Sequence, residues 1–129
     1  MIKKMIIGIT LFFSQGCTHI LYMKTIKGEY KVELDFTDNE IESDKTVIKG
    51  TIKDISNAHF LPYSLITLDN TKYGISADSA GKYYLKVPSG NYRIIAKSAG
   101  NTDLKTKQMC FKSKEVITIN FFLGTKTVY

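Results

Sequence analysis

The segment Asp78–Ile94 (DSAGKYYLKVPSGNYRI) constrains the fold of this chain more than any other stretch. Asp78 and Gly81 predict a tight turn, because an aspartate side chain accepts a backbone hydrogen bond two residues on and glycine tolerates a positive φ. In Lys82–Val87, apolar and polar side chains then alternate with the period of a strand that buries one face. A Pro-Ser-Gly sequence interrupts the pattern, and Asn91–Ala96 predicts the returning strand. We therefore expect a β-hairpin.

Other strand-like segments recur along the chain at a spacing of roughly ten residues. They are Val47–Lys53, Ser64–Leu68, Tyr73–Ser76, Lys105–Phe111 and Glu115–Leu123. Gly50 lies inside the first of them and marks a bulge or a close backbone approach. With 43% hydrophobic and 23% charged residues in 129 positions, the composition favours one folded domain. Together with the hairpin, these segments predict an all-β fold, a seven-stranded β-sandwich.

An additional strand is predicted before the sandwich. Glu29–Phe36 (EYKVELDF) alternates apolar and charged residues, which is typical of a half-buried strand. This segment either joins the sheet as an edge strand or pairs with the sheet edge of a partner. The stretch Thr18–Lys27 before it is a moderately apolar connector, and Thr37–Lys45 after it is a polar, acidic loop.

The amino terminus has the pattern of an export signal. Met1–Lys4 is basic and Met5–Phe13 is an apolar run, too short to span a bilayer. Ser-Gln-Gly-Cys follows, and the order resembles a bacterial lipoprotein signal in which Gly16 is the small residue before the acylated Cys17. The usual leucine three residues before the cysteine is replaced by Ser14, a looseness familiar in Bacteroidetes. An ordinary secretory signal cleaved nearby, or a buried first strand, is the alternative.

This pattern predicts the domain organisation and the location of the protein. Residues 1–16 are the signal peptide, 17–46 the anchor cysteine, linker and additional strand, 47–124 the sandwich, and 125–129 a tail. Several acyl chains on Cys17 would hold the protein stably on a membrane, where a single chain would be marginal. We expect a membrane-anchored protein of the cell envelope, on the outer membrane, that faces either the periplasm or the exterior.

The chain contains two cysteines, Cys17 and Cys110. An intramolecular disulfide between them is formally possible. An acylated Cys17 could not form it, and Cys110 would then be a buried strand thiol that behaves as a small hydrophobe.

Four sequence elements resemble those of one domain family, in order and spacing. They are Ile48–Asp54 (IKGTIKD), Leu61–Leu68 (LPYSLITL), Ser76–Leu85 (SADSAGKYYL) and Val87–Ile94 (VPSGNYRI). The family is the carboxypeptidase regulatory-like domain, which is common in Bacteroidetes envelope proteins. The resemblance implies a transthyretin-like (prealbumin-like) Greek-key sandwich over about 47–123. It also implies a non-catalytic role, since the family's domains are appended to peptidases or to outer-membrane transporters. Where the family often carries Gly-Tyr, this chain has Gly-Asn at 100–101.

No constellation of residues in the sequence predicts catalysis or metal binding. His19 and His59 lie far apart, and the lone carboxylate of Asp78 is too few ligands for calcium. Cys110 has no recognisable base and orienting partner. We therefore expect no enzyme activity, no metal and no cofactor. The net charge falls from +6 to +4 without residues 1–16, and no basic run with interleaved aromatics predicts nucleic-acid binding.

The outward face of the hairpin's first strand is the candidate binding surface. It presents Tyr84 between Lys82 and Lys86, which suits contact with a sugar or a protein partner. The simpler interpretation is that β-sandwiches use tyrosine routinely. We expect a structural or protein-interaction module of the envelope, with a glycan- or peptide-binding lipoprotein as the alternative.

Overall fold

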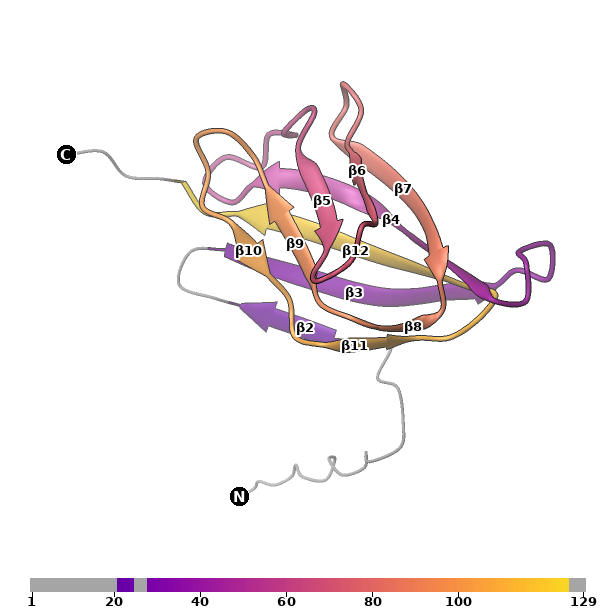
Figure 1. The fold of residues 1–129 in the computed structure, drawn as a ribbon. Coiled ribbons are helices and arrows are strands. Elements are labelled where there is room, and N and C mark those ends of the chain that lie inside the picture. Colours follow the sequence, from indigo (N-terminus) through magenta and orange to yellow (C-terminus); the bar gives the residue numbers. More distant parts are fainter. Residues whose placement is uncertain (1–20, 25–27, 126–129) are drawn as a thin grey trace, which may run out of the picture.

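The structure, a computed structural model, describes residues 21–24 and 28–125, and these residues form only strands and loops (Figure 1). The strands are β2 (Leu21–Lys24), β3 (Gly28–Thr37), β4 (Lys45–Asp54), β5 (Leu65–Leu68), β6 (Gly74–Ser76), β7 (Lys82–Pro88), β8 (Gly90–Tyr92), β9 (Ile94–Lys97), β10 (Leu104–Lys105), β11 (Met109–Phe111) and β12 (Glu115–Leu123). No described segment is a helix long and apolar enough to cross a bilayer. The predicted signal peptide, Cys17, His19 and residues 126–129 lie outside the described residues.

Two sheets pack against each other as a sandwich. One has five strands in the order β2-β3-β12-β4-β7, and the other has four in the order β10-β9-β5-β6. A two-stranded ribbon of β8 and β11 runs along the lower edge of the view in Figure 1. The all-β sandwich predicted from the strand spacing is therefore confirmed.

The core between the sheets follows the alternation seen in the sequence. In β7, Tyr83, Leu85 and Val87 are buried, whereas the lysines and Tyr84 between them are exposed. Burial of these side chains and of the aliphatic residues facing them removes apolar surface from water, the main favourable contribution to folding. The Tyr83 hydroxyl has no access to water and donates a hydrogen bond to the Ile119 carbonyl, which satisfies a polar group that burial would otherwise penalise.

The predicted additional strand belongs to the five-stranded sheet. It is β3, which pairs antiparallel with β12 from Gly28–Leu123 to Thr37–Glu115. Its Tyr30 and Val32 are buried in the common core. Because β12 lies between β3 and β4, the sheet extends upstream of Val47, where the sequence placed the start of the sandwich.

Two predicted strands are each divided in the structure. The predicted strand Asn91–Ala96 becomes β8 and β9, and Lys105–Phe111 becomes β10 and β11. The reason is a change of partners, because among the described strands β9 pairs with β5 and β10, whereas β8 pairs with β11. Thr106, which is buried, joins the point where β8 passes into β9 to the segment between β10 and β11. Its Oγ1 accepts a hydrogen bond from the Ile94 amide at 2.9 Å, and its own amide donates to the Ile94 carbonyl at 2.9 Å.

A polar cluster, which we call the C-terminal clasp, ties the end of β12 to the end of β4. The buried Asn101 side chain donates to Asp54 Oδ2 at 2.9 Å and to the Gly124 carbonyl at 3.1 Å. The Thr125 hydroxyl donates to the same carboxylate. Gly100, with a φ of 82°, forms the turn that delivers Asn101. The clasp gives a structural reason for the Gly-Asn sequence at this position.

Candidate functional site

The outer face of the five-stranded sheet carries all three residues predicted as a binding surface, and two of them line a common depression. Tyr84 is 57% exposed and lies opposite Lys49 of β4, while Lys82 lies opposite Thr51. They border a shallow depression of about 260 Å³. It is lined by Lys49, Gly50, Thr51, Lys82, Tyr83, Tyr84, Thr118 and Asn120. We call Lys49, Lys82, Tyr84 and Asn120 the outer-sheet patch.

The third predicted residue, Lys86, does not line this depression. Its ammonium forms an ion pair with the Glu42 carboxylate at 3.0 Å. A hydrogen bond from its own backbone and one from Lys86 lower the pKa of Glu42, and the hydrogen bond to Glu42 raises the pKa of Lys86. Both side chains are exposed, so the pair is a surface contact of small energy. Lys86 is therefore paired with the loop before β4, whereas Lys82 and Tyr84 border the depression.

Close backbone packing makes the floor of the depression rigid. A side chain at Gly50 would overlap the Ile119 carbonyl oxygen, so the predicted close approach at this glycine is confirmed. The parallel ladder between β4 and β12 is interrupted there. Asn120 fills the gap, because its Oδ1 accepts hydrogen bonds from the Thr51 amide at 3.0 Å and the Thr51 hydroxyl at 3.1 Å.

The predicted turn at Asp78 positions the start of β7. The Asp78 carboxylate accepts hydrogen bonds from the amides of Lys82 at 2.9 Å and Ala80 at 2.8 Å. These two bonds lower the pKa of Asp78. Gly81 has a φ of 73°, as the turn requires. The prediction from the sequence is confirmed, and the turn fixes where Lys82 leaves the loop.

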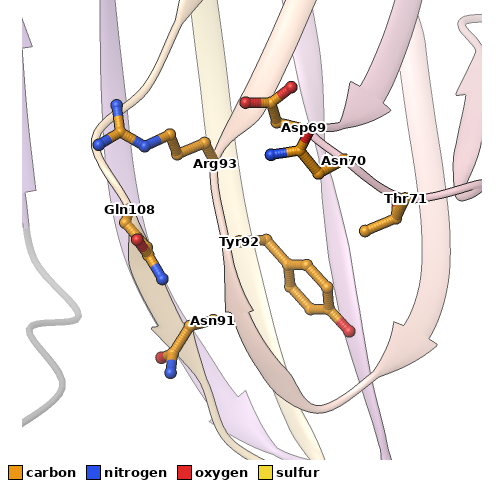
Figure 2. Close-up of a pocket in the computed structure, with 7 residues that line it drawn as sticks. All are labelled: Asp69, Asn70, Thr71, Asn91, Tyr92, Arg93 and Gln108. Carbon is orange, nitrogen blue, oxygen red and sulfur yellow. The ribbon is translucent and has the colours of Figure 1, made fainter.

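Sequence reasoning missed a second cavity, at the point where the chain changes sheets (Figure 2). It has a volume of about 270 Å³. Its lining residues are Asp69, Asn70, Thr71, Asn91, Tyr92, Arg93 and Gln108. These come from three separate segments of the chain, so no local pattern predicted their meeting. The sequence offers one signal for this cavity, which is the presence of polar residues next to the ends of predicted strands.

Cys110 is disulfide-bonded in the structure, so the prediction of a buried thiol at this position is wrong. Met109 and Phe111 on either side are buried in the core, and Cys110 alternates with them in β11 opposite Asn91. The alternation places the Cys110 side chain on the opposite face of β11 from Met109 and Phe111. The other cysteine of the sequence, Cys17, lies outside the described residues.

No described group of three or more His, Cys, Asp or Glu residues could hold a metal ion. His59 is exposed in the loop after β4. The largest pKa shifts among the described acids and tyrosines are caused by hydrogen bonds and burial within the fold. Hydrogen bonds from Ser56 and then Asn101 lower the pKa of Asp54 to about 2, and burial raises the pKa of Tyr83 well above its usual value.

These observations define a small β-sandwich module with a polar outer-sheet patch and a second polar cavity at one side. Comparison with protein families then identifies it. Residues 48–129, well over half of the chain, match the CarboxypepD_reg-like domain, and the chain belongs to this family. The resemblance inferred from the sequence elements is therefore confirmed for the domain. A search of curated proteins found no match.

Proposed function

We propose that this protein is a lipid-anchored envelope protein of a bacterium, of the Bacteroidetes type, whose single domain is a non-catalytic interaction module. The outer-sheet patch is its partner surface. The observation that carries this proposal is Tyr84, a 57% exposed aromatic ring on a regular strand beside Lys82. Aromatic residues are enriched in the centres of protein interfaces, where they bury a large area with few rotatable bonds.

The arrangement of the patch supports binding rather than catalysis. Its functional groups are ammonium, phenol and amide groups on a flat sheet face, with no carboxylate or imidazole among the lining residues. General acid–base catalysis near neutral pH most often uses an imidazole or a carboxylate. The rigid floor at Gly50 favours a preformed docking surface, since little conformational freedom is lost on binding. In this proposal the strands β4 to β12 follow the Greek-key order of transthyretin-like domains.

Photo-crosslinking in the native envelope tests the patch. A photoreactive phenylalanine analogue replaces Tyr84, and a matched control replaces Leu65, which is 41% exposed on the outer face of the opposite sheet. We expect a discrete crosslinked species from position 84 that is lost when Lys82 is changed to glutamate. Equal crosslinking from both positions would remove the patch from the proposal.

The anchor rests on Cys17 and is tested separately. Acylation and a disulfide both use the Cys17 sulfur, so one molecule cannot carry both. Intact mass of protein from membranes of the native host distinguishes them. A mass for residues 17–129 plus acyl chains supports the anchor, and Cys17→Ala should then release a folded protein from the membrane. An unacylated mass, or a variant that stays membrane-bound, contradicts it.

A second function, binding of a glycan or peptide at the same patch, is favoured by the lysines that flank the aromatic ring. Lys82 and Lys49 would attract an anionic ligand, and the Tyr84 ring offers an apolar face. If the purified protein binds a glycan or peptide in the absence of any other envelope protein, this function is favoured over the interaction module.

A further inference from the structure

The second cavity lies away from the outer-sheet patch and has its own chemistry (Figure 2). One side is the turn after β5, with Asp69 and Asn70, and another is the crossover from β8 to β9 at Tyr92 and Arg93. Gln108, between β10 and β11, completes the lining. The cavity lies where the chain passes between the β8–β11 ribbon and the four-stranded sheet that contains β9 and β10.

Hydrogen bonds and a ring contact hold the walls of this cavity. The Asp69 amide donates to the Arg93 carbonyl at 2.8 Å, which joins the turn to the crossover. The Tyr92 hydroxyl donates to the Pro88 carbonyl at 2.7 Å, and its ring packs on Phe111 with 6.0 Å between centroids. The walls are therefore held in place before any ligand arrives, which lowers the entropy lost on binding.

Four polar side chains of the cavity are available to a ligand. Within residues 21–24 and 28–125, the side chains of Arg93, Asn70, Asn91 and Gln108 make no hydrogen bond or ion pair. Figure 2 shows the Arg93 and Gln108 side chains to the left of the segment that carries Tyr92 and Arg93, and Asn70 and the Tyr92 ring to its right. A guanidinium offers only donors, whereas each amide offers a donor and an acceptor.

The charge balance favours an anion. The Asp69 carboxylate is paired with the Lys105 ammonium at 3.2 Å, so its charge is compensated. Among the described residues that line the cavity, Arg93 is the only other charged one. A guanidinium matches a carboxylate in a planar, bidentate geometry that an ammonium cannot reproduce.

We propose that this cavity binds a uronic-acid residue of an acidic glycan. Arg93 would bind the carboxylate, and the amides of Asn70, Asn91 and Gln108 would donate to and accept from the ring hydroxyls. A volume of about 270 Å³ fits one sugar ring better than a longer ligand. A peptide carboxyl terminus would use the same Arg93 and could pair its main-chain groups with the amides, so the experiment below includes a peptide-like carboxylate. The site requires neither the anchor nor the outer-sheet patch.

Titration of the whole protein with glucuronic acid, followed by the amide signals of residues 69–71, 91–93 and 108 in NMR spectra, tests the proposal. We expect saturable shifts confined to these residues, with glucose binding at least about tenfold more weakly because it lacks the charged partner of Arg93. Arg93→Gln should weaken glucuronate binding by about tenfold or more. Arg93→Lys should recover only part of the loss, because the planar fork is absent.

Lys97→Gln is the matched control, because it removes the same charge from the other end of β9, where Lys97 faces Asp103 at 3.8 Å. Glucuronate affinity should be unchanged in this variant. Equal affinity for N-acetylglycine and glucuronate would overturn the glycan assignment in favour of a peptide carboxylate. Shifts that are absent, or that persist in Arg93→Gln, would overturn the site itself.

Discussion

The C-terminal clasp predicts a measurable, pH-dependent contribution to stability. In Asn101→Ala, the Asp54 carboxylate loses a donor at 2.9 Å and the Gly124 carbonyl loses one at 3.1 Å. A hydrogen bond to a charged group contributes about 1.5–3 kcal/mol and a neutral one about 0.5–1.5 kcal/mol. We therefore expect Asn101→Ala to lower the free energy of unfolding at pH 7 by about 2–3 kcal/mol.

The Asp54 carboxylate gives the pH dependence its sign. Its pKa is lowered from 3.8 to about 2 by hydrogen bonds from Ser56 and Asn101. A lowered pKa in the folded state means that the stabilisation is fully present above about pH 4 and is lost as the pH falls towards 2. The full shift corresponds to about 2.4 kcal/mol, and because the carboxylate is partly exposed, solvent screening reduces this to about 1 kcal/mol.

A double-mutant cycle with Asp54→Ala and Asn101→Ala, measured by urea unfolding between pH 2 and 7, tests this reasoning. We expect a coupling free energy of about 0.5–1 kcal/mol at pH 7 that falls as Asp54 is protonated. Asp103→Ala is the control, since that carboxylate is exposed and 3.8 Å from Lys97. Additive effects at pH 7, or a coupling that does not change with pH, would refute the account of the clasp.

Three further changes test the packing, each by urea unfolding at pH 7. Gly50→Ala should destabilise the fold by about 3 kcal/mol or more, because the new Cβ overlaps the Ile119 carbonyl; a loss below about 1 kcal/mol would contradict this. Tyr83→Phe should cost about 1–3 kcal/mol, since a buried hydrogen bond to Ile119 is lost, and an unchanged midpoint would count against it. Thr106→Val should lower the free energy of unfolding by about as much and should also weaken glucuronate binding. If the variant binds glucuronate with unchanged affinity, Thr106 does not contribute to the cavity.

The sequence by itself determined the features that depend on near neighbours. The turn at Asp78 and Gly81, the buried and exposed faces of β7 and the close approach at Gly50 were all predicted, because a turn needs particular side chains and a strand alternates with period two. The order and spacing of such local elements also sufficed to indicate the CarboxypepD_reg-like domain.

Only the tertiary structure decided which strands pair and which distant side chains meet. The alternation in β3 indicates a strand but not its partner, and its place beside β12 follows from burial of Tyr30 and Val32. The divisions at Arg93 and Thr106 arise where strands exchange partners between sheets, which no short-range pattern records. The second cavity and the clasp likewise assemble from loops separated by many residues, because hydrogen bonds and packing across the sandwich bring them together.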